Sequence, residues 1–158
     1  RSIPRCGYEV LKVTTSDIEE LLQLRYILEG GLLKLSINKI TERQIELLIE
    51  ADKCCADQSV PFWKHWDYNI RFHLQLAAFS RNQYANSGLR KTLNMLKLAY
   101  AQQNYENNLN AKHYIDTVNH AGLIQMIREK NLPGALNALK DDLCAFGSFS
   151  PNIIDIYE

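Results

Sequence analysis

Two histidines lie on helical stretches whose neighbouring side chains are apolar. His73 follows Asn69 by four residues, a spacing that puts both side chains on the same face of a helix. His120 stands four and seven residues before Ile124 and Ile127. Imidazole nitrogens and side-chain oxygens bind divalent metals inside helical bundles. These residues predict a metal site, although a neutral buried histidine with a backbone partner explains either histidine alone.

A carboxylate also interrupts an apolar stripe near the end of the chain. Asp142 sits beside Leu143, where an unpaired charge would be costly to bury. Asp142 is therefore a further candidate donor. His113 and Asp116 lie about two turns and one turn before His120. They are rival ligands that spacing alone leaves open.

Arg25 lies within the apolar stripe of the first long helical stretch, and Glu29 follows one turn later. One interpretation is a partly buried ion pair that joins helices. The other is an arginine that faces a cavity and grips a ligand carboxylate with two hydrogen bonds. The residues alone leave both interpretations open.

The composition limits the possible function classes. The 158 residues include 18 basic and 18 acidic ones, so the chain has no net charge with which to attract nucleic acid. No apolar run reaches the length of a membrane span. The four cysteines lack zinc-like spacing, which favours reduced thiols in a cytoplasmic protein. They are Cys6, Cys54, Cys55 and Cys144. Glycine-rich phosphate loops, GxSxG and HExxH are absent from the sequence, so no enzyme is indicated.

The elements that must position these residues are helices. The apolar periodicity predicts an all-α protein, an antiparallel bundle of about six helices after a short extended segment at residues 1–13. Ser16 and Glu19 have the spacing of a capping box at the first helix, and Thr41 opens the second. Asn131 is the expected terminator of the fifth. The expected ranges are about 16–38, 41–57, 61–80, 84–105, 111–130 and 133–146.

The expected organisation is one helical domain over residues 14–147, preceded by a linker and followed by a peripheral tail at 148–158. Ordered motifs along nearly the whole chain resemble the FCD domain, the C-terminal half of many GntR-type bacterial regulators. Residues 1–13 would then be the remnant of the wing of a missing winged-helix domain. The motifs are Gly7-Tyr8-Glu9-Val10, Asp17-Ile18, Leu24-Arg25, Leu28-Glu29, Phe72-His73, Ser80-Arg81-Asn82, Asn119-His120 and the stretch 131–143.

The resemblance implies a ligand set for one divalent metal. Many members of the family hold zinc, nickel or manganese with an aspartate and a histidine four residues apart plus two later histidines. Those positions fall on Asn69, His73, His120 and Asp142. An amide thus replaces the aspartate and an aspartate replaces the last histidine. Because an amide oxygen is a weak ligand for such metals, occupancy and the absence of metal are both open.

The resemblance also implies a function. In this family small organic acids bind over the metal, so the expected effector contacts are Arg25, Asn82, His73 and His120. Without a metal, Arg25 would be the source of positive charge for an anion. A homodimer would control DNA binding by the missing N-terminal domain. The alternatives are a metal-dependent enzyme in a helical bundle and a purely structural dimerisation module.

Overall fold

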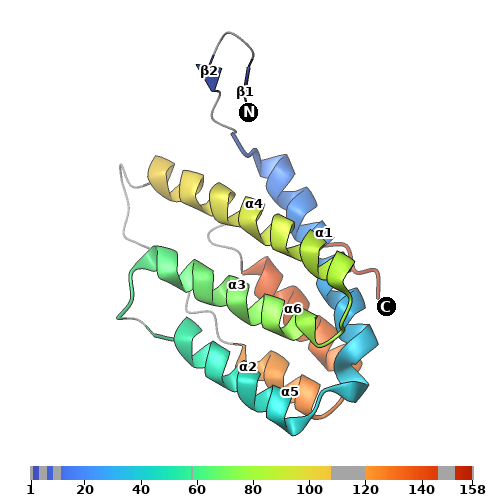
Figure 1. The fold of residues 1–158 in the computed structure, drawn as a ribbon. Coiled ribbons are helices and arrows are strands. Elements are labelled where there is room, and N and C mark those ends of the chain that lie inside the picture. Colours follow the sequence, from blue (N-terminus) through green and yellow to red (C-terminus); the bar gives the residue numbers. More distant parts are fainter. Residues whose placement is uncertain are drawn as a thin grey trace.

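A computed structural model describes residues 2–3, 7–8, 12–57, 59–107, 120–145 and 152–157 of the chain. Within these ranges it has six α-helices, arranged as the predicted bundle (Figure 1). The all-α prediction is confirmed. The elements are β1 Ser2–Ile3, β2 Gly7–Tyr8, α1 Thr15–Ser36, the 3-10 helix η1 Ile37–Lys39, α2 Glu42–Cys55, α3 Phe62–Ala78, α4 Gln83–Asn107, α5 Ala121–Arg128 and α6 Leu132–Cys144.

The extended segment before the bundle contains a short hairpin. Strands β1 and β2 pair antiparallel, with Ser2 opposite Tyr8 and Ile3 opposite Gly7. Figure 1 shows this hairpin beyond the N-terminal end of α1, away from the other helices. The sequence prediction of a strand or extended linker at this end is consistent with the pairing.

Helix α1 begins two residues earlier than the predicted capping box implies. Thr14 is the N-cap, and its hydroxyl accepts a hydrogen bond from the Asp17 backbone amide at 3.2 Å. Asp17 in turn accepts from the Thr14 amide at 2.7 Å. The prediction of Ser16 and Glu19 was wrong. Val13 donates its amide hydrogen to the Gln102 side chain on α4 at 2.9 Å, which holds the chain extended just before Thr14.

The start of α2 follows the sequence more closely, whereas α5 begins at Ala121 with His120 as its N-cap, inside the range predicted as one continuous helix. Thr41 caps α2 in a capping box with Gln44, as the position of Thr41 predicts. Asn131 was expected to end the fifth helix, but Lys130 is the residue in the left-handed conformation, with φ of 57°. Asn131 instead caps α6 by accepting from the Gly134 amide at 3.0 Å. Residues 108–119, which include most of the first half of the predicted fifth helix, lie outside the described residues.

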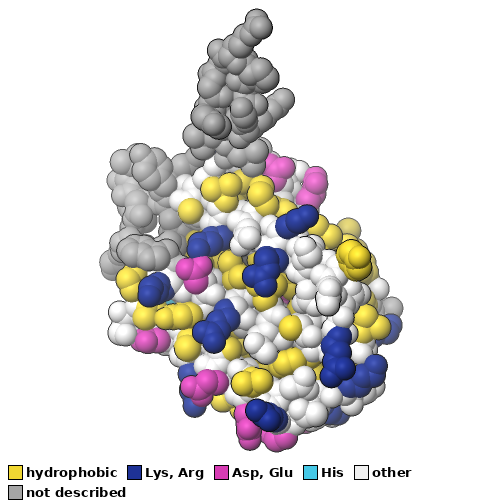
Figure 2. Space-filling model, in the orientation of Figure 1, with side chains coloured by type: hydrophobic (Ala, Val, Ile, Leu, Met, Phe, Trp, Pro, Cys, Tyr) yellow, Lys and Arg dark blue, Asp and Glu magenta, His cyan; other side chains and the backbone are white. Residues whose placement is uncertain are grey.

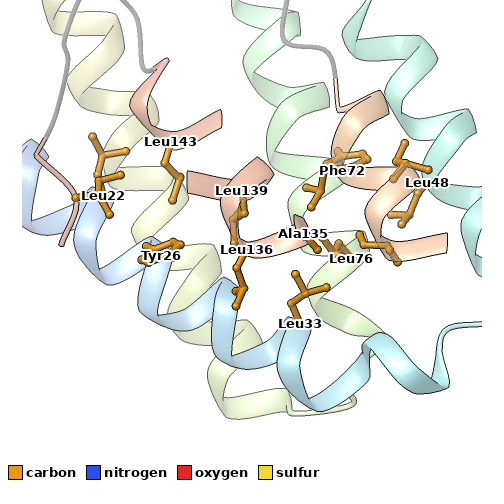
Figure 3. Close-up of a cluster of buried hydrophobic side chains, with 14 of the residues drawn as sticks. Leu22, Tyr26, Leu33, Leu48, Phe72, Leu76, Ala135, Leu136, Leu139 and Leu143 are labelled. Atoms are coloured by element: carbon orange, nitrogen blue, oxygen red, sulfur yellow. The ribbon is translucent and has the colours of Figure 1, made fainter. Parts of the chain in front are cut away.

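The core lies where α1, α3 and α6 meet, with α2 and α5 packed against α3 and α6 respectively (Figures 1 and 3). Leucines, isoleucines and aromatic rings fill it, and burial of each such side chain contributes about 1.5–3 kcal/mol. The labelled members are Leu22, Tyr26, Leu33, Leu48, Phe72, Leu76, Ala135, Leu136, Leu139 and Leu143. Within this apolar setting a few buried residues are polar, and Arg25, Glu29, His73 and His120 among them form one connected cluster.

The C-terminal segment is more than a peripheral tail. Residues 152–157 pack on the bundle, and Ile153 is buried in the main core cluster. Tyr157 lies against Gly30 of α1. The sequence gives no periodic signal over so short a stretch, so this contact could not be predicted from it. None of the described helices is both long and apolar enough to cross a lipid bilayer.

Candidate functional site

Two buried histidine rings form the centre of the candidate site. His73 comes from the middle of α3, and His120 is the N-cap residue of α5. Their side chains are fully enclosed, and their Nε2 atoms lie 3.2 Å apart. The ring of Phe72 stacks on His120 with centroids 3.7 Å apart, which fixes the plane of that imidazole. The predicted convergence of these two histidines is what the structure shows.

The outer nitrogen of each ring is bonded to a carboxylate. Nδ1 of His73 lies 2.6 Å from Glu29 on α1, and Nδ1 of His120 lies 2.7 Å from Asp52 on α2. A carboxylate only accepts hydrogen bonds, so each Nδ1 carries the proton. The Nε2 atoms are then left with lone pairs directed at each other. Such an arrangement is favourable when a proton or a metal ion lies between them.

Asp142 and Arg25 complete the cluster. The Asp142 carboxylate lies 3.3 Å from Nε2 of His73 and 3.7 Å from Nε2 of His120. The same group accepts from Nη2 of Arg25 at 3.3 Å. Arg25 also donates from Nε to Glu29 at 2.6 Å. Arg25 is therefore a buried ion-pair partner that links α1 to α6, and two of its donors are engaged by the protein's own carboxylates.

The donor set fits a divalent metal. In a tetrahedral or octahedral site with bonds near 2.1 Å, neighbouring ligand atoms are roughly 3.0–3.4 Å apart. The separations of 3.2 Å between the histidines and 3.3 Å from His73 to Asp142 fall in that range. In addition, Oδ1 of Asn69 is buried without a hydrogen-bond partner among the described residues. A buried oxygen without a hydrogen-bond partner, one turn from His73, is what a metal-ligand position predicts.

The charges of the cluster are strongly coupled. Burial and Arg25 lower the pKa of His73, but the carboxylates of Glu29 and Asp142 more than offset them, so this pKa lies above its ordinary value. Burial holds the pKa of His120 below its ordinary value despite the bond to Asp52. Burial raises the pKa values of Glu29 and Asp142, yet His73 and Arg25 bring both below normal. Glu29 and Asp142 are thus ionised. Of the two histidines, only His73 is favoured in its protonated form, so the pair carries one extra proton.

Not all predicted site residues lie in this cluster. Asn82 is exposed at the start of α4, where its side chain accepts from the Ala85 amide at 3.0 Å as a helix cap. The structure does not bring Asn82 to His73 and His120. The rival ligands His113 and Asp116 lie outside the described residues.

The sequence prediction missed Asp52. It lies four residues after Leu48 and three before Cys55, so helical spacing puts it on the buried stripe of α2, and that signal could have identified it. Ligand atoms of Asp52, Cys55 and His120 lie within 4.8 Å of one another. Burial and the charge of Asp52 raise the pKa of the Cys55 thiol to about 12, so the thiol stays protonated.

Comparisons with known proteins agree with this architecture. The family model of the FCD domain matches residues 20–143. The fold is similar to that of E. coli McbR/YncC, with a TM-score of 0.72 at 16% sequence identity over 90% of this chain and 72% of that one. It is also similar to a transcriptional regulator, a GntR family member from Pseudomonas syringae pv. tomato str. DC3000. That match has a TM-score of 0.68 at 22% identity, over 92% of this chain and 60% of the other. No curated protein matches the chain.

Proposed function

The chain belongs to the FCD domain family, and we propose that it is the effector-binding and dimerisation domain of a GntR-type transcription regulator. In this proposal a small organic acid binds in the bundle and changes DNA binding by a winged-helix domain on the same polypeptide. The family is a regulatory one, which favours a binding role over catalysis.

The observation that carries the proposal is the buried cluster of His73, His120 and Asp142 with its supporting ion pairs. Burying ionised groups costs several kcal/mol each before their attraction is counted, and apolar residues often replace such groups without loss of stability. The fold alone therefore does not require this cluster. A role in binding gives a reason for it.

The charges of the site favour an acid that binds together with a metal. The cluster contains three carboxylates, those of Glu29, Asp52 and Asp142, but only one guanidinium, that of Arg25, which pairs with Glu29 and Asp142. A free organic acid would meet an excess of negative charge there. A divalent ion held by His73, His120, Asp142 and Asn69 would neutralise that excess and offer a carboxylate a point of attachment. Arg25 alone is a weaker anion site than its sequence position implies, because two of its donors are already engaged.

The effect of ligand binding would reach the winged-helix domain through α1. This helix supplies Arg25 and Glu29 to the site and follows directly after the extended N-terminal segment. A ligand that displaced Asp142 from Arg25 would change how α1 sits against α6. A change in α1 would alter the spacing of two winged-helix domains across a dimer.

The proposed dimer interface is the apolar face that α1 and α4 share. Leu24 and Leu35 of α1 are 41% and 58% exposed, and Leu98 of α4 is 39% exposed. Half-buried Leu28 lies between the first two on the same face of α1, next to Gly88 of α4. An exposed apolar stripe of this kind is typical of association surfaces.

On the face formed by α3 and α4, basic side chains separate the apolar ones and would repel their copies across a two-fold axis (Figure 2).

Substitution at this face tests the dimer. Leu24→Glu is expected to give a monomer by size-exclusion chromatography with light scattering, because it places two charges in the apolar interface. Leu47→Glu on α2 is the control, since Leu47 is similarly exposed at 48% but lies on another helix. A wild-type monomer, or a dimer that survives Leu24→Glu, would contradict the proposed interface.

The sensing role is tested by thermal unfolding with Zn²⁺, Ni²⁺ or Mn²⁺, each with and without a panel of small organic acids. A ligand at a hundred times its Kd stabilises by about 2.7 kcal/mol, which corresponds to roughly 5–10 °C in a domain of this size. We expect a metal to raise the Tm and an acid to raise it further only when metal is present. His73→Gln should remove both shifts. No shift with any combination would favour a structural dimerisation module instead.

A further inference from the structure

The final segment of the chain, residues 152–157, is bonded to α1 along a single face of that helix. The side-chain amide of Gln23 accepts from the Ile154 amide at 2.7 Å and donates to the Ile154 carbonyl at 3.0 Å. One residue earlier, Ile153 is buried in the core. The segment is therefore anchored both by paired hydrogen bonds and by an apolar side chain.

Tyr157 occupies a space that exists because α1 has a glycine there. A Cβ built on Gly30 would lie 2.3 Å from Cε2 of Tyr157, far closer than two carbon atoms can approach. The Tyr157 hydroxyl donates to the Ile27 carbonyl at 2.5 Å, and its ring meets the ring of Tyr26 edge-on at 5.4 Å. Glycine is a poor helix former, so its presence within α1 needs an explanation. The space that Gly30 leaves for the Tyr157 ring provides one.

Asp155 connects the segment to a second helix. One carboxylate oxygen accepts from the Tyr26 hydroxyl on α1 at 2.9 Å and from the Tyr157 amide at 3.0 Å. The other accepts from Nζ of Lys140 on α6 at 3.3 Å. Asp155 therefore joins α1 to α6 through its own side chain.

These two helices also carry the site. Tyr26 is adjacent to Arg25, and Lys140 precedes Asp142 by two residues. The direct link between the helices at the site, from Arg25 to Asp142, measures 3.3 Å. Charge-assisted bonds of this type are usually 2.7–2.9 Å long, so this one sets the helix separation only weakly. Metal coordination tolerates errors of about 0.2 Å in ligand distances. The separation of α1 and α6 therefore matters for metal binding at the site.

We propose that residues 152–157 form a positioning strap for the site, in which Asp155 and Tyr157 hold α1 against α6. The strap keeps the Asp142 carboxylate beside His73 and keeps Glu29 on the other side of the same ring. The metal-binding consequence rests on the proposed function. The positioning of the His73 ring does not, and the two can be measured separately.

The first measurement is NMR of the imidazole N–H groups in the full, metal-free chain. Tyr157→Ala and Asp155→Asn should shift or broaden the Nδ1–H signal of His73 and speed its exchange with water about tenfold or more. The Nδ1–H signal of His120 is an internal reference, because its partner Asp52 lies on α2, whereas the hydrogen bonds of the strap described above go to α1, to α6 or within the strap. Ile156→Ala is the matched control, since Ile156 is 48% exposed in the same segment. An unchanged His73 signal in folded Tyr157→Ala and Asp155→Asn overturns the proposal.

The second measurement is the affinity for Co²⁺, followed by its visible absorption and by competition with a chelator, at a temperature where every variant is folded. Tyr157→Ala and Asp155→Asn should weaken binding about tenfold, as loss of an outer partner of a metal ligand commonly does, and Ile156→Ala should not. Equal Co²⁺ affinity in all variants overturns the strap's role at the metal site. If the wild-type chain binds no Co²⁺, the metal part of the proposed function fails, and the NMR comparison still decides the strap.

Discussion

The Nε2 atoms of His73 and His120 face each other at 3.2 Å while their Nδ1 atoms are held by Glu29 and Asp52. This relationship defines the chemistry of the cluster. Both outer nitrogens are committed as donors, so the inner pair needs one positive centre between them. A proton would compete with the proposed metal ion for that place, so stability and metal affinity are both expected to depend on pH.

The metal-free protein should therefore be most stable near pH 6.5. The folded pKa of His73 lies above 6.5, so its contribution to stability is complete below that pH and is lost as pH rises through the raised value. The folded pKa of His120 lies below 6.5, so its contribution is present above that pH and is lost as pH falls through the lowered value. Urea unfolding from about pH 5.5 to 8.5 measures this profile.

In the proposed site a metal ion would replace the shared proton, so Zn²⁺ should remove the decline on the alkaline side. His73→Gln should also lack that decline, because the group that loses the proton is gone. Wild-type stability that stays constant above pH 6.5 without metal would contradict the assignment of the proton to His73.

Asn69→Asp should have opposite effects on metal affinity and on the stability of the metal-free protein. It supplies the carboxylate that the family pattern has at this position and should tighten Zn²⁺ binding about tenfold or more. Without metal it adds a fourth carboxylate near Glu29 and Asp142 and should lower the Tm. Chelator competition and unfolding with and without metal measure the two effects. If Asn69→Asp changes stability but leaves Zn²⁺ affinity unchanged, residue 69 is not a ligand.

Arg25→Met should destabilise the metal-free protein by about 3–5 kcal/mol, because it leaves the buried carboxylates of Glu29 and Asp142 without their cation. Arg128→Gln is the matched control. It breaks the pair with Glu42, whose side chain is 63% exposed, and should cost less than about 1 kcal/mol. Urea unfolding compares the two variants. Equal costs would mean that the Arg25 pairs are as solvent-screened as the surface pair.

Gly30→Ala should have opposite effects in two backgrounds. In the wild-type chain the new methyl group collides with the Tyr157 ring and should lower stability. In Tyr157→Ala the space is free, and the better helix former should raise stability by about 1 kcal/mol. A double-mutant cycle measured by thermal unfolding gives the coupling between the two positions. Coupling near zero would show that Tyr157 does not pack on Gly30 in solution.

Much of the bundle could be predicted because helical periodicity is a local property. The stripes that contain Arg25, His73 and Asp142 follow from spacings of three and four residues, and their convergence was the expected consequence of folding. Asp52 lies on a comparable stripe, between the buried Leu48 and Cys55, and the same spacing could have identified it. Asn82 caps α4 and Thr14 caps α1. Neither role could be predicted, because other residues nearby are equally able to cap a helix and only the local backbone geometry selects between them. The contact of Tyr157 with Gly30 joins positions 127 residues apart, and only the tertiary fold brings them together.

The bond from Asp142 to Arg25 has a further consequence for ligand recognition. The carboxylate of Asp142 already stands where the carboxylate of an arriving acid would seek the guanidinium, so the domain contains its own competitor for that position. An acid that reaches Arg25 must exchange with it, and this internal competition lowers the apparent affinity by the fraction of time the position is taken. The same exchange removes the direct bond between α1 and α6 at the site. Weak binding and conformational response would then have one origin.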